Sequence, residues 1–214
     1  MTTAFRAARD GDVPFLATVL EMASRGHLPR GPWDLCFPED AERMRALTLL
    51  AGGEVRSWCH RSVFEIAEVD GAAGAAVVSF PADELGDSLG KALLDGFQRL
   101  AWSPERSAAV GPLLAPHLRC FPDMPPGRWI VENVGTRPDL RRRGLVAALL
   151  ERALQRGRER GFARAQISCL IGNDAAQRAY ENAGFTVVEE LRDAAFEAMI
   201  GVPGFSRMTL ALKE

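Results

Sequence analysis

Residues 138–146, with the sequence PDLRRRGLV, combine three consecutive arginines with a glycine. They lie between an expected strand and a helix whose apolar side chains recur at helical spacing from Leu145 to Leu154. The first turn of a helix has unpaired backbone N–H groups and partial positive charge, so it can bind an anion such as pyrophosphate. Gly144 would let that ligand approach the backbone. The segment therefore predicts an anion-binding loop, unless Asp139 caps the turn or the arginines are only solvated.

Positive charge is concentrated around this loop. Nine arginines and three acidic residues lie between Arg137 and Arg164, in a chain whose formal net charge is −2. A basic segment in an otherwise acidic protein is typical of a site for a compact polyanion, although a solvated basic helix face has the same composition. The overall charge gives no reason to expect a nucleic acid partner.

The elements that would position the loop follow from periodicity and turn residues. Asp70-Gly71 joins two β-like runs and is a strong hairpin signal, so the first half of the sheet should be antiparallel. After residue 127, strands alternate with helices, which indicates an α/β layer. The predicted fold class is α/β (α+β), with a mixed, partly antiparallel central sheet flanked by helices. We expect strands at 2–8, 63–69, 75–80, 129–134, 165–170, 185–191 and 208–212, and helices beginning after the cap Asp12 and at 39–50, 85–102, 107–118, 143–160 and 174–182.

The length of 214 residues fits a single domain, 1–214, that contains an insertion. Residues 81–127, between the third and fourth strands, are helical and then Pro-rich, and we expect them to form an inserted helical lid. Residues 27–38 are rich in Pro and Gly and are predicted to be a loop. No stretch has the roughly 20 apolar residues of a membrane span, so no membrane partner is expected and the protein should be cytoplasmic.

The cysteines and histidines are scattered along the chain. No C-x-x-C pair occurs, so buried thiols are expected instead of disulfides or a zinc site. The histidines have no cluster of partner ligands, so no metal site is expected. The residues concerned are Cys36, Cys59, Cys120, Cys169, His27, His60 and His117.

Arg141 and Gly144 carry a resemblance to a known family. The pattern R-x-x-G-x-V that they begin resembles the acyl-CoA signature of the GNAT acetyltransferases, Q/R-x-x-G-x-G/A. Val146 departs from it, because the family usually has Gly or Ala there. The resemblance implies that Arg142 and Arg143 contact the phosphates of coenzyme A. It also implies that the branched side chain of Val146 either crowds this ligand or packs inward.

The resemblance extends over most of the chain. Arg6 and Asp12 resemble the first strand and helix cap of the family, and residues 65–74 resemble its hairpin. Residues 173–185 match the later pattern N-x-x-A-x-x-x-Y-x-x-x-G-F. The G-x-G-x-x-G of a Rossmann dinucleotide site is absent. The resemblance thus implies a GNAT-type fold with acetyl-CoA as cosubstrate.

In this family, backbone groups of the strand before the anion loop hold the acyl carbonyl, here at about residues 133–135. A nucleophilic side chain is then unnecessary, and Cys169 is expected to be a packing residue. The residues implied to bind the cosubstrate are Val134, Gly135, Thr136, Arg141, Arg142, Arg143, Gly144, Leu145, Val146 and Asn173.

Glu132 and Tyr180 are implied to be catalytic. Aminolysis of a thioester needs an acceptor for the amine proton and a proton for the departing thiolate. Glu132 lies where many family members place the carboxylate that accepts this proton through water; the alternative is a surface or salt-bridged glutamate. Tyr180 matches the position whose phenol protonates the thiolate; the alternative is a core aromatic residue. Asn173 bonds the pantetheine arm, caps its helix, or does both.

The function implied is transfer of an acetyl group from acetyl-CoA to a primary amine in a ternary complex. The acceptor, a small molecule or a protein amine, is not identified by the sequence, and a homodimer stays open. A non-catalytic acyl-CoA sensor of the same fold is the alternative. A third hypothesis, a helix that docks nucleic acid, depends on the arginine run alone. The residues expected by analogy around the amine pocket are Trp33, Asp34 and Phe37, with Trp102, Phe121 and Trp129 as further candidates.

Overall fold

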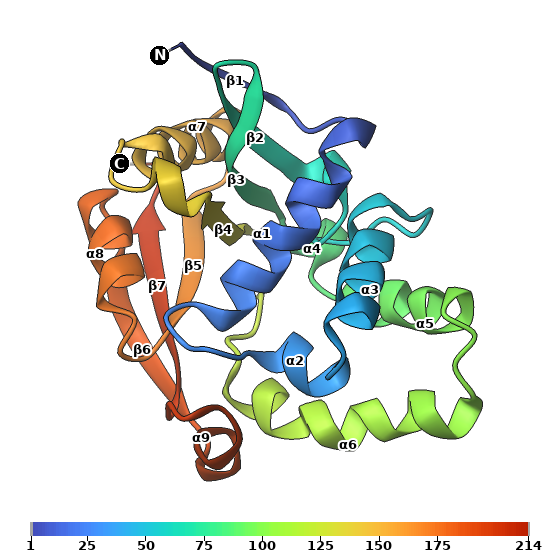
Figure 1. The fold of residues 1–214 in the computed structure, drawn as a ribbon. Coiled ribbons are helices and arrows are strands. Elements are labelled where there is room, and N and C mark those ends of the chain that lie inside the picture. The colour runs from blue at the N-terminus through green and yellow to red at the C-terminus, as the bar shows by residue number, and fades with distance from the viewer. Residues whose placement is uncertain (1, 214) are drawn as a thin grey trace.

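The computed structural model describes residues 2–213, which form a seven-stranded sheet flanked by helices (Figure 1). The strand order is β1-β2-β3-β4-β5-β7-β6, and all neighbours are antiparallel except β4 and β5, which are parallel. This arrangement confirms the mixed, partly antiparallel sheet expected from the sequence. The strands are β1 (Thr3–Ala7), β2 (Phe64–Val69), β3 (Ala72–Pro81), β4 (Arg128–Thr136), β5 (Arg164–Leu170), β6 (Thr186–Arg192) and β7 (Gly204–Ala211).

Helices cover both faces of the sheet, and the expected helical insertion lies between β3 and β4. Within this insertion, α5 packs against α3, and α6 packs against α2 and α9. The helices are α1 (Val13–Arg25), α2 (Pro32–Cys36), α3 (Asp40–Gly52), α4 (Ala82–Leu85), α5 (Leu89–Arg99), α6 (Pro104–Cys120), α7 (Leu145–Glu159), α8 (Asp174–Asn182) and α9 (Ala194–Ile200), with 3₁₀ turns at Asp10–Asp12, Arg61–Val63 and Pro138–Leu140.

Side chains alternate between the two faces of the sheet and build two cores. Ile66 and Ile130 belong to the core that α1 and α3 cover. The residues that follow them in the chain, Ala67 and Val131, belong to the core that α7 and α8 cover. This period of two is the geometry of a strand with both faces buried. All four cysteines are free and buried, as expected.

Two short helices lie outside the sequence prediction. α2 falls within residues 27–38, so the prediction of a loop is wrong there, and α9 connects β6 to β7. Neither helix is long enough to show a helical period in the sequence. Pro32 begins α2, and the carboxylate of Asp193 caps α9 by accepting the N–H of Phe196 at 2.8 Å.

Asp12 occupies the N-cap position of α1, but its carboxylate makes no hydrogen bond to the first turn of that helix. The carboxylate accepts the N–H of Arg9 at 2.7 Å and two guanidinium N–H groups of Arg6 at 2.6 and 2.9 Å. A bidentate charged pair is stronger than a single hydrogen bond to a neutral N–H group, so the carboxylate of Asp12 binds Arg6 and not the first turn of α1. Asp12 is therefore at the predicted N-cap position, but its side chain ties α1 to β1 instead of capping the helix.

The hairpin between β2 and β3 turns at Asp70 and Gly71. Both residues have a left-handed φ, 48° and 83°. Two consecutive positive φ angles are the requirement of a type I′ turn, whose twist matches that of the strands it joins. The hairpin predicted from this dipeptide is confirmed.

β4 and β5 are paired over only part of their length. Their last pair is Val131 with Ile167, although β4 continues to Thr136. The register of β4 on β3 shifts in this region, and Asn133 has a left-handed φ of 49°. Because a bulge bends its strand and strengthens the local twist, β4 turns away from β5. The backbone after Val131 is left without a strand partner on that side.

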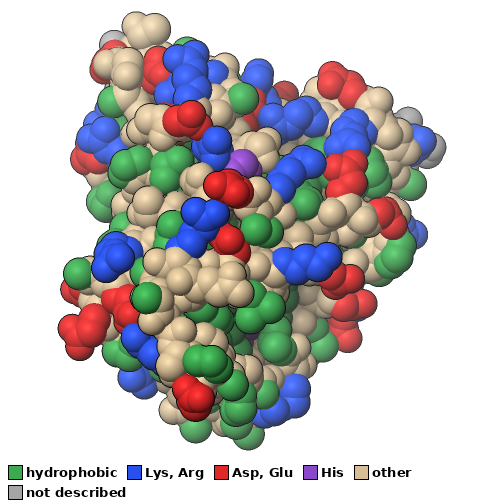
Figure 2. Space-filling view, turned by 90° about the vertical axis from the view of Figure 1, so that its right-hand side faces the viewer, with side chains coloured by type: hydrophobic (Ala, Val, Ile, Leu, Met, Phe, Trp, Pro, Cys, Tyr) green, Lys and Arg blue, Asp and Glu red, His purple; other side chains and the backbone are tan. Residues whose placement is uncertain are grey.

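Charges on the face shown in Figure 2 are mixed. Lys and Arg side chains are interspersed with Asp and Glu and form no single basic patch there. This face therefore lacks the feature typical of a nucleic-acid-binding surface. Within residues 2–213, no helix combines the length and hydropathy needed to cross a bilayer.

Candidate active site

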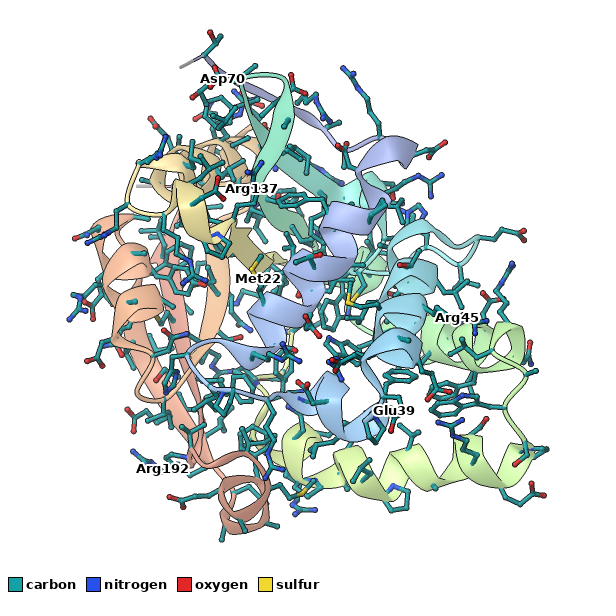
Figure 3. The ribbon with its side chains drawn as sticks, viewed as in Figure 1. Met22, Glu39, Arg45, Asp70, Arg137 and Arg192 are labelled. Carbon is teal, nitrogen blue, oxygen red and sulfur yellow. The ribbon has the colours of Figure 1, made fainter. Side chains whose placement is uncertain are left out.

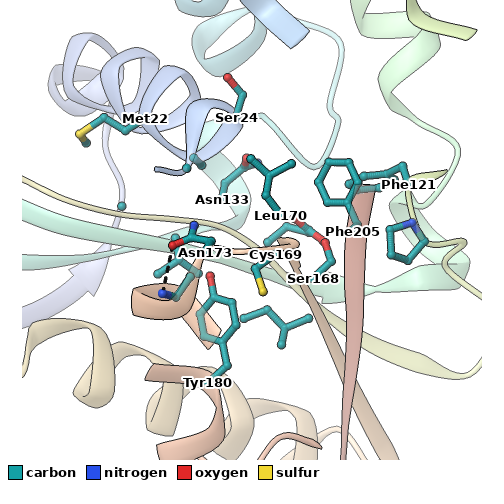
Figure 4. Close-up of a pocket in the computed structure, with 18 of the residues that line it drawn as sticks. Met22, Ser24, Phe121, Asn133, Ser168, Cys169, Leu170, Asn173, Tyr180 and Phe205 are labelled. Carbon is teal, nitrogen blue, oxygen red and sulfur yellow. Dashed lines mark hydrogen bonds between the residues drawn. The ribbon is translucent and has the colours of Figure 1, made fainter. Parts of the chain in front are cut away.

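A cleft of about 1390 Å³ opens where β4 and β5 separate (Figure 4). The start of α7 with its arginines forms one end of this cleft, and aromatic side chains from α6 and β7 form the other. The fold brings together every residue that the sequence implied for catalysis or for binding of the cosubstrate. The cleft is lined by Glu132, Val134, Gly135, Thr136, Arg141, Arg142, Arg143, Gly144, Leu145, Val146, Asn173 and Tyr180.

The start of α7 is open to a ligand. Gly144 stands at its N-cap with a left-handed φ of 77°, and no side chain caps the helix. The carboxylate of Asp139 does not take this role, because it pairs with Arg137 at 2.8 Å. A Cβ added to Gly144 would meet nothing within 4 Å, so the glycine serves the backbone conformation instead of relieving a steric clash. The N–H groups of the first turn are thus available to an anion.

The basic segment divides into two parts. Arg152 and Arg156 of α7 both pair with Glu65 of β2, whose side chain is buried. Among residues 2–213, the side chains of Arg141 and Arg142 make no ion pair or hydrogen bond with protein. Arg141 and Arg142 thus leave uncompensated positive charge at the loop, whereas Arg152 and Arg156 of the helix are neutralised by Glu65, and this arrangement suits a compact polyanion better than a duplex.

Val146 packs inward. Its side chain is half-buried and lies against the core under α7, while part of it lines the cleft. The departure from Gly or Ala is thus accommodated by packing on the sheet side. The next residue, Ala147, presents the small side chain on the exposed side of the same turn.

The free edge of β4 forms the middle of the cleft. Gly135 lies close under α1, because an added Cβ would be 2.9 Å from Cγ1 of Val19 and 3.4 Å from Cε of Met22. Figure 3 shows Met22 of α1 over the centre of the sheet. The Oγ1 of Thr136 is buried and has no hydrogen-bond partner among the described residues. A ligand that lies along this edge can satisfy both that hydroxyl and the free backbone groups.

Glu132 lies at the point where the two strands separate. Its Oε1 accepts a hydrogen bond of 2.9 Å from Oγ of Ser168, and it forms no salt bridge within the described chain. Burial raises the pKa of Glu132 to about 7, while the hydrogen bonds from Ser168 and from the Asn133 backbone lower it. A carboxyl group with this pKa exchanges a proton near neutral pH, as a general base must. The alternative of a surface or salt-bridged glutamate does not describe this residue.

Ser168 was not singled out from the sequence. The parallel pair of Val131 with Ile167 places the next residues, Glu132 and Ser168, side by side at the separation of the strands. The only signal in the sequence is a hydroxyl between the apolar residues Ile167 and Cys169, and it acquires meaning only once the register is known.

Tyr180 stands on α8 and points into the cleft, with its hydroxyl end toward Cys169 and Asn173 (Figure 4). The side chain is 7 % exposed, and its hydroxyl has no hydrogen-bond partner among residues 2–213. Burial, and then the nearby Cys169 and Glu132, raise the pKa of the phenol well above its usual value. The phenol is therefore protonated at neutral pH and available as a donor.

Asn173 and Cys169 flank this phenol. Oδ1 of Asn173 accepts the N–H of Ala176 at 3.3 Å and caps α8, so the capping role is realised. Burial raises the pKa of the Cys169 thiol to about 11, which keeps it protonated and weakly nucleophilic. The packing role expected for Cys169 agrees with its place in the core under α7.

The aromatic residues expected around the amine pocket are only partly brought there. Trp33 and Phe121 line the cleft. Trp129 does not, because it is buried under α7 and donates its indole N–H to the carbonyl of Ala153 at 2.8 Å. Trp102 donates its indole N–H to Glu42 and packs on Phe97, and the expectation for it is likewise wrong. The remaining expected residues, Asp34 and Phe37, lie outside the cleft lining, the first paired with Arg25 and the second in the core.

A mixed sheet that opens between two parallel strands, with an uncapped helix start beside the opening, gives a cleft that suits a phosphate-bearing ligand. The sequence profile of the Acetyltransferase (GNAT) family matches residues 54–185. The chain belongs to this family, and it is an acetyltransferase with acetyl-CoA as cosubstrate. No curated protein was found to match the chain in sequence.

Solved structures share the fold over nearly the whole chain. One, described only as an acetyltransferase, has a TM-score of 0.70 at 16% identity and covers 98% of this chain and 100% of its own. An N-acetyltransferase from Staphylococcus aureus Mu50 has a TM-score of 0.67 at 16% identity, covering 97% and 100%. The protein yncA from Salmonella typhimurium, solved with its cofactor acetyl-CoA, has a TM-score of 0.54 at 16% identity, covering 100% and 96%.

Proposed function

We propose that this protein transfers the acetyl group of acetyl-CoA to a primary amine by direct attack in a ternary complex. The observation that carries the proposal is the pair formed by Glu132 and Ser168, with a carboxyl pKa of about 7, in the same cleft as the protonated phenol of Tyr180. A group that accepts a proton and a group that gives one thus border a single space.

The donor is proposed to lie along the start of α7 and the free edge of β4. Gly144 and the N–H groups of the first turn of α7 receive the pyrophosphate, and Arg141, Arg142 and Arg143 approach its charges. The backbone of residues 133–135 orients the acyl carbonyl, and Thr136 supplies a hydroxyl that is otherwise unpaired. Val134, Leu145, Val146 and Asn173 complete the walls of this part of the cleft.

The reaction is proposed to need two proton transfers by the protein. The amine nitrogen attacks the thioester carbon, and its proton passes to the Glu132 carboxylate directly or through one water. The carbon–sulfur bond then breaks, and the thiolate takes the phenol proton of Tyr180. Both groups return to their starting states by exchange with solvent. No acyl-enzyme is formed, in agreement with the protonated thiol of Cys169.

We infer that residues 1–214 act as one domain in which residues 81–127 border the acceptor. Asp87, Leu118 and Phe121 of this insertion line the cleft beyond Glu132. This location fits a lid that covers the amine and excludes water from the reacting atoms. The acceptor is a small molecule or a protein amine.

Release of free thiol from acetyl-CoA, measured with a panel of primary amines, tests the proposal. We expect amine-dependent thiol release that falls by about 10²-fold in Glu132→Gln, the scale usual for a positioned base. The alternative is an acyl-CoA sensor. It would be supported if acetyl-CoA raised the melting temperature and no amine produced thiol.

A further inference from the structure

The half of the cleft beyond Glu132 differs in chemistry from the donor half. We call it the acceptor end and define it by six residues that line it. They are Trp58, His117, Leu118, Phe121, Met124 and Phe205. Four of them are aromatic or imidazole rings, and none has a carboxylate. None is cationic at neutral pH, because the imidazole of His117 is uncharged there.

The rings of the acceptor end pack on one another. Trp58 and Phe121 lie parallel with centroids 6.4 Å apart. Phe205 meets Phe121 edge-on, with centroids 5.3 Å apart and planes at 81° (Figure 4). Leu118 extends this surface to the rim and remains 65 % exposed. An exposed leucine beside ordered rings favours an apolar ligand, because binding removes this surface from water.

His117 keeps this end electrically neutral. Its Nδ1 is buried without a hydrogen-bond partner among the described residues, and burial lowers its pKa to about 4. The imidazole is therefore uncharged at neutral pH. A neutral ring neither repels an approaching ammonium group nor offers a second charged partner to the ligand.

The carboxylates that line the cleft are placed so that one ammonium group, and not two, meets an opposite charge inside it. Glu132 is the carboxylate at the reacting centre. Asp123 is already paired with Arg207 at 2.6 Å, and Asp87 is exposed at the rim. A second ammonium group among the rings would lose its hydration without gaining an opposite charge, which is costly.

We propose that the acceptor is a primary monoamine with an aromatic or bulky apolar body, which lies against Trp58, Phe121 and Phe205 while its amine reaches Glu132. This inference rests on the function proposed above and names its substrate class. The same surface disfavours short, polar amines, because they make too few apolar contacts with it. It disfavours polyamines, because their second ammonium group would be desolvated without an opposite charge.

A direct test compares 2-phenylethylamine, ethanolamine, spermidine and a lysine-containing peptide as acceptors at saturating acetyl-CoA. We expect kcat/KM for 2-phenylethylamine to exceed that of each other amine by at least about tenfold, since pocket contacts of this size discriminate by roughly 10 to 200-fold. A faster reaction with spermidine would mean that the rings hold a second cation and would overturn the inference. A faster reaction with the peptide would overturn it in favour of a protein acceptor.

Two leucines offer a matched pair of variants. Leu118→Glu adds a carboxylate to the acceptor end, whereas Leu94→Glu adds one to α5 at a site that is 58 % exposed and does not line the cleft. We expect Leu118→Glu to raise the ratio of kcat/KM for spermidine to that for 2-phenylethylamine by about threefold or more. Leu94→Glu should leave the ratio unchanged. Equal effects of the two variants would contradict the assignment of this surface.

Phe121→Ser and Phe121→Leu test the ring contact. The serine variant should raise KM for 2-phenylethylamine by about tenfold, the leucine variant should restore most of the loss, and both should keep the wild-type KM for acetyl-CoA. An unchanged KM for 2-phenylethylamine in Phe121→Ser would remove the inference and leave the proposed function intact. Absence of thiol release with every amine would instead reject the proposed function.

Discussion

Oγ of Ser168 donates a hydrogen bond of 2.9 Å to Oε1 of Glu132 across the point where β4 and β5 part. The two residues are neighbours because Val131 and Ile167 form the last pair of the parallel strands. Beyond this pair the sheet opens, so a carboxyl group of the central sheet borders a cleft while remaining largely removed from water. This location is the cause of its raised pKa.

The raised pKa of Glu132 predicts the pH dependence of the reaction. Its carboxylate form increases as the pH rises through about 7, so kcat/KM should show a rising limb over that range, in addition to the limb that titration of the amine gives at higher pH. The hydrogen bond from Ser168 lowers the pKa, and Ser168→Ala should therefore move this limb to higher pH. The measurement is kcat/KM against pH with one amine for all variants. In Glu132→Gln the profile of kcat/KM against pH should show only the titration of the amine substrate. An unchanged profile in Ser168→Ala would show that Glu132 is not the titrating base.

Tyr180→Phe removes the hydroxyl and keeps the ring. We expect kcat to fall by about 10²-fold with little change in acetyl-CoA affinity, because a proton donor acts on the departing thiolate and not on the bound donor. The melting temperature should change little, because the hydroxyl has no hydrogen-bond partner among residues 2–213. Steady-state rates and thermal melts measure the two effects. A wild-type kcat, with chemistry rate-limiting, would make Tyr180 a packing residue.

Two variants of Gly144, with Asp and with Asn, have nearly the same shape and differ in charge, so they test whether an anion binds at this position. Its left-handed φ of 77° is tolerated by Asn and Asp better than by other side chains, and the space around its Cβ is open. Gly144→Asp should abolish the rise in melting temperature that millimolar acetyl-CoA produces, because the carboxylate repels the pyrophosphate. Gly144→Asn should retain most of the rise. Similar shifts in the two folded variants would place the pyrophosphate elsewhere.

Arg43 should contribute strongly to the stability of the helices beside the cleft. Its side chain, 4 % exposed, donates to Glu21 at 2.7 Å and to the carbonyl of Phe37 at 3.0 Å, and so joins α3 to α1 and to the end of α2. Arg43→Ala should lower the free energy of unfolding by about 3 kcal/mol, because Glu21 loses a buried partner. Arg45, two residues further on α3 and exposed, is the control (Figure 3). Arg45→Ala should change it by less than about 0.5 kcal/mol in urea unfolding. Equal losses would show that the buried network contributes nothing specific.

Features set by a few adjacent residues could be predicted from the sequence. Asp70-Gly71 gives the hairpin because its two positions accept positive φ, and Gly144 gives the open helix start for the same reason. The long amphipathic α7 follows from the spacing of its leucines. These features place the anion loop between β4 and α7, so the loop proposed to receive the cosubstrate could be predicted from the sequence.

Features set by partners distant in the chain were decided by the tertiary structure. The charge of Arg152 could be free or neutralised, and Glu65, buried on β2, neutralises it. Ser168 meets Glu132 only through the strand register. Local conformational preference acts over a few residues, whereas burial and charge pairing depend on which distant side chains the packed sheet brings into contact.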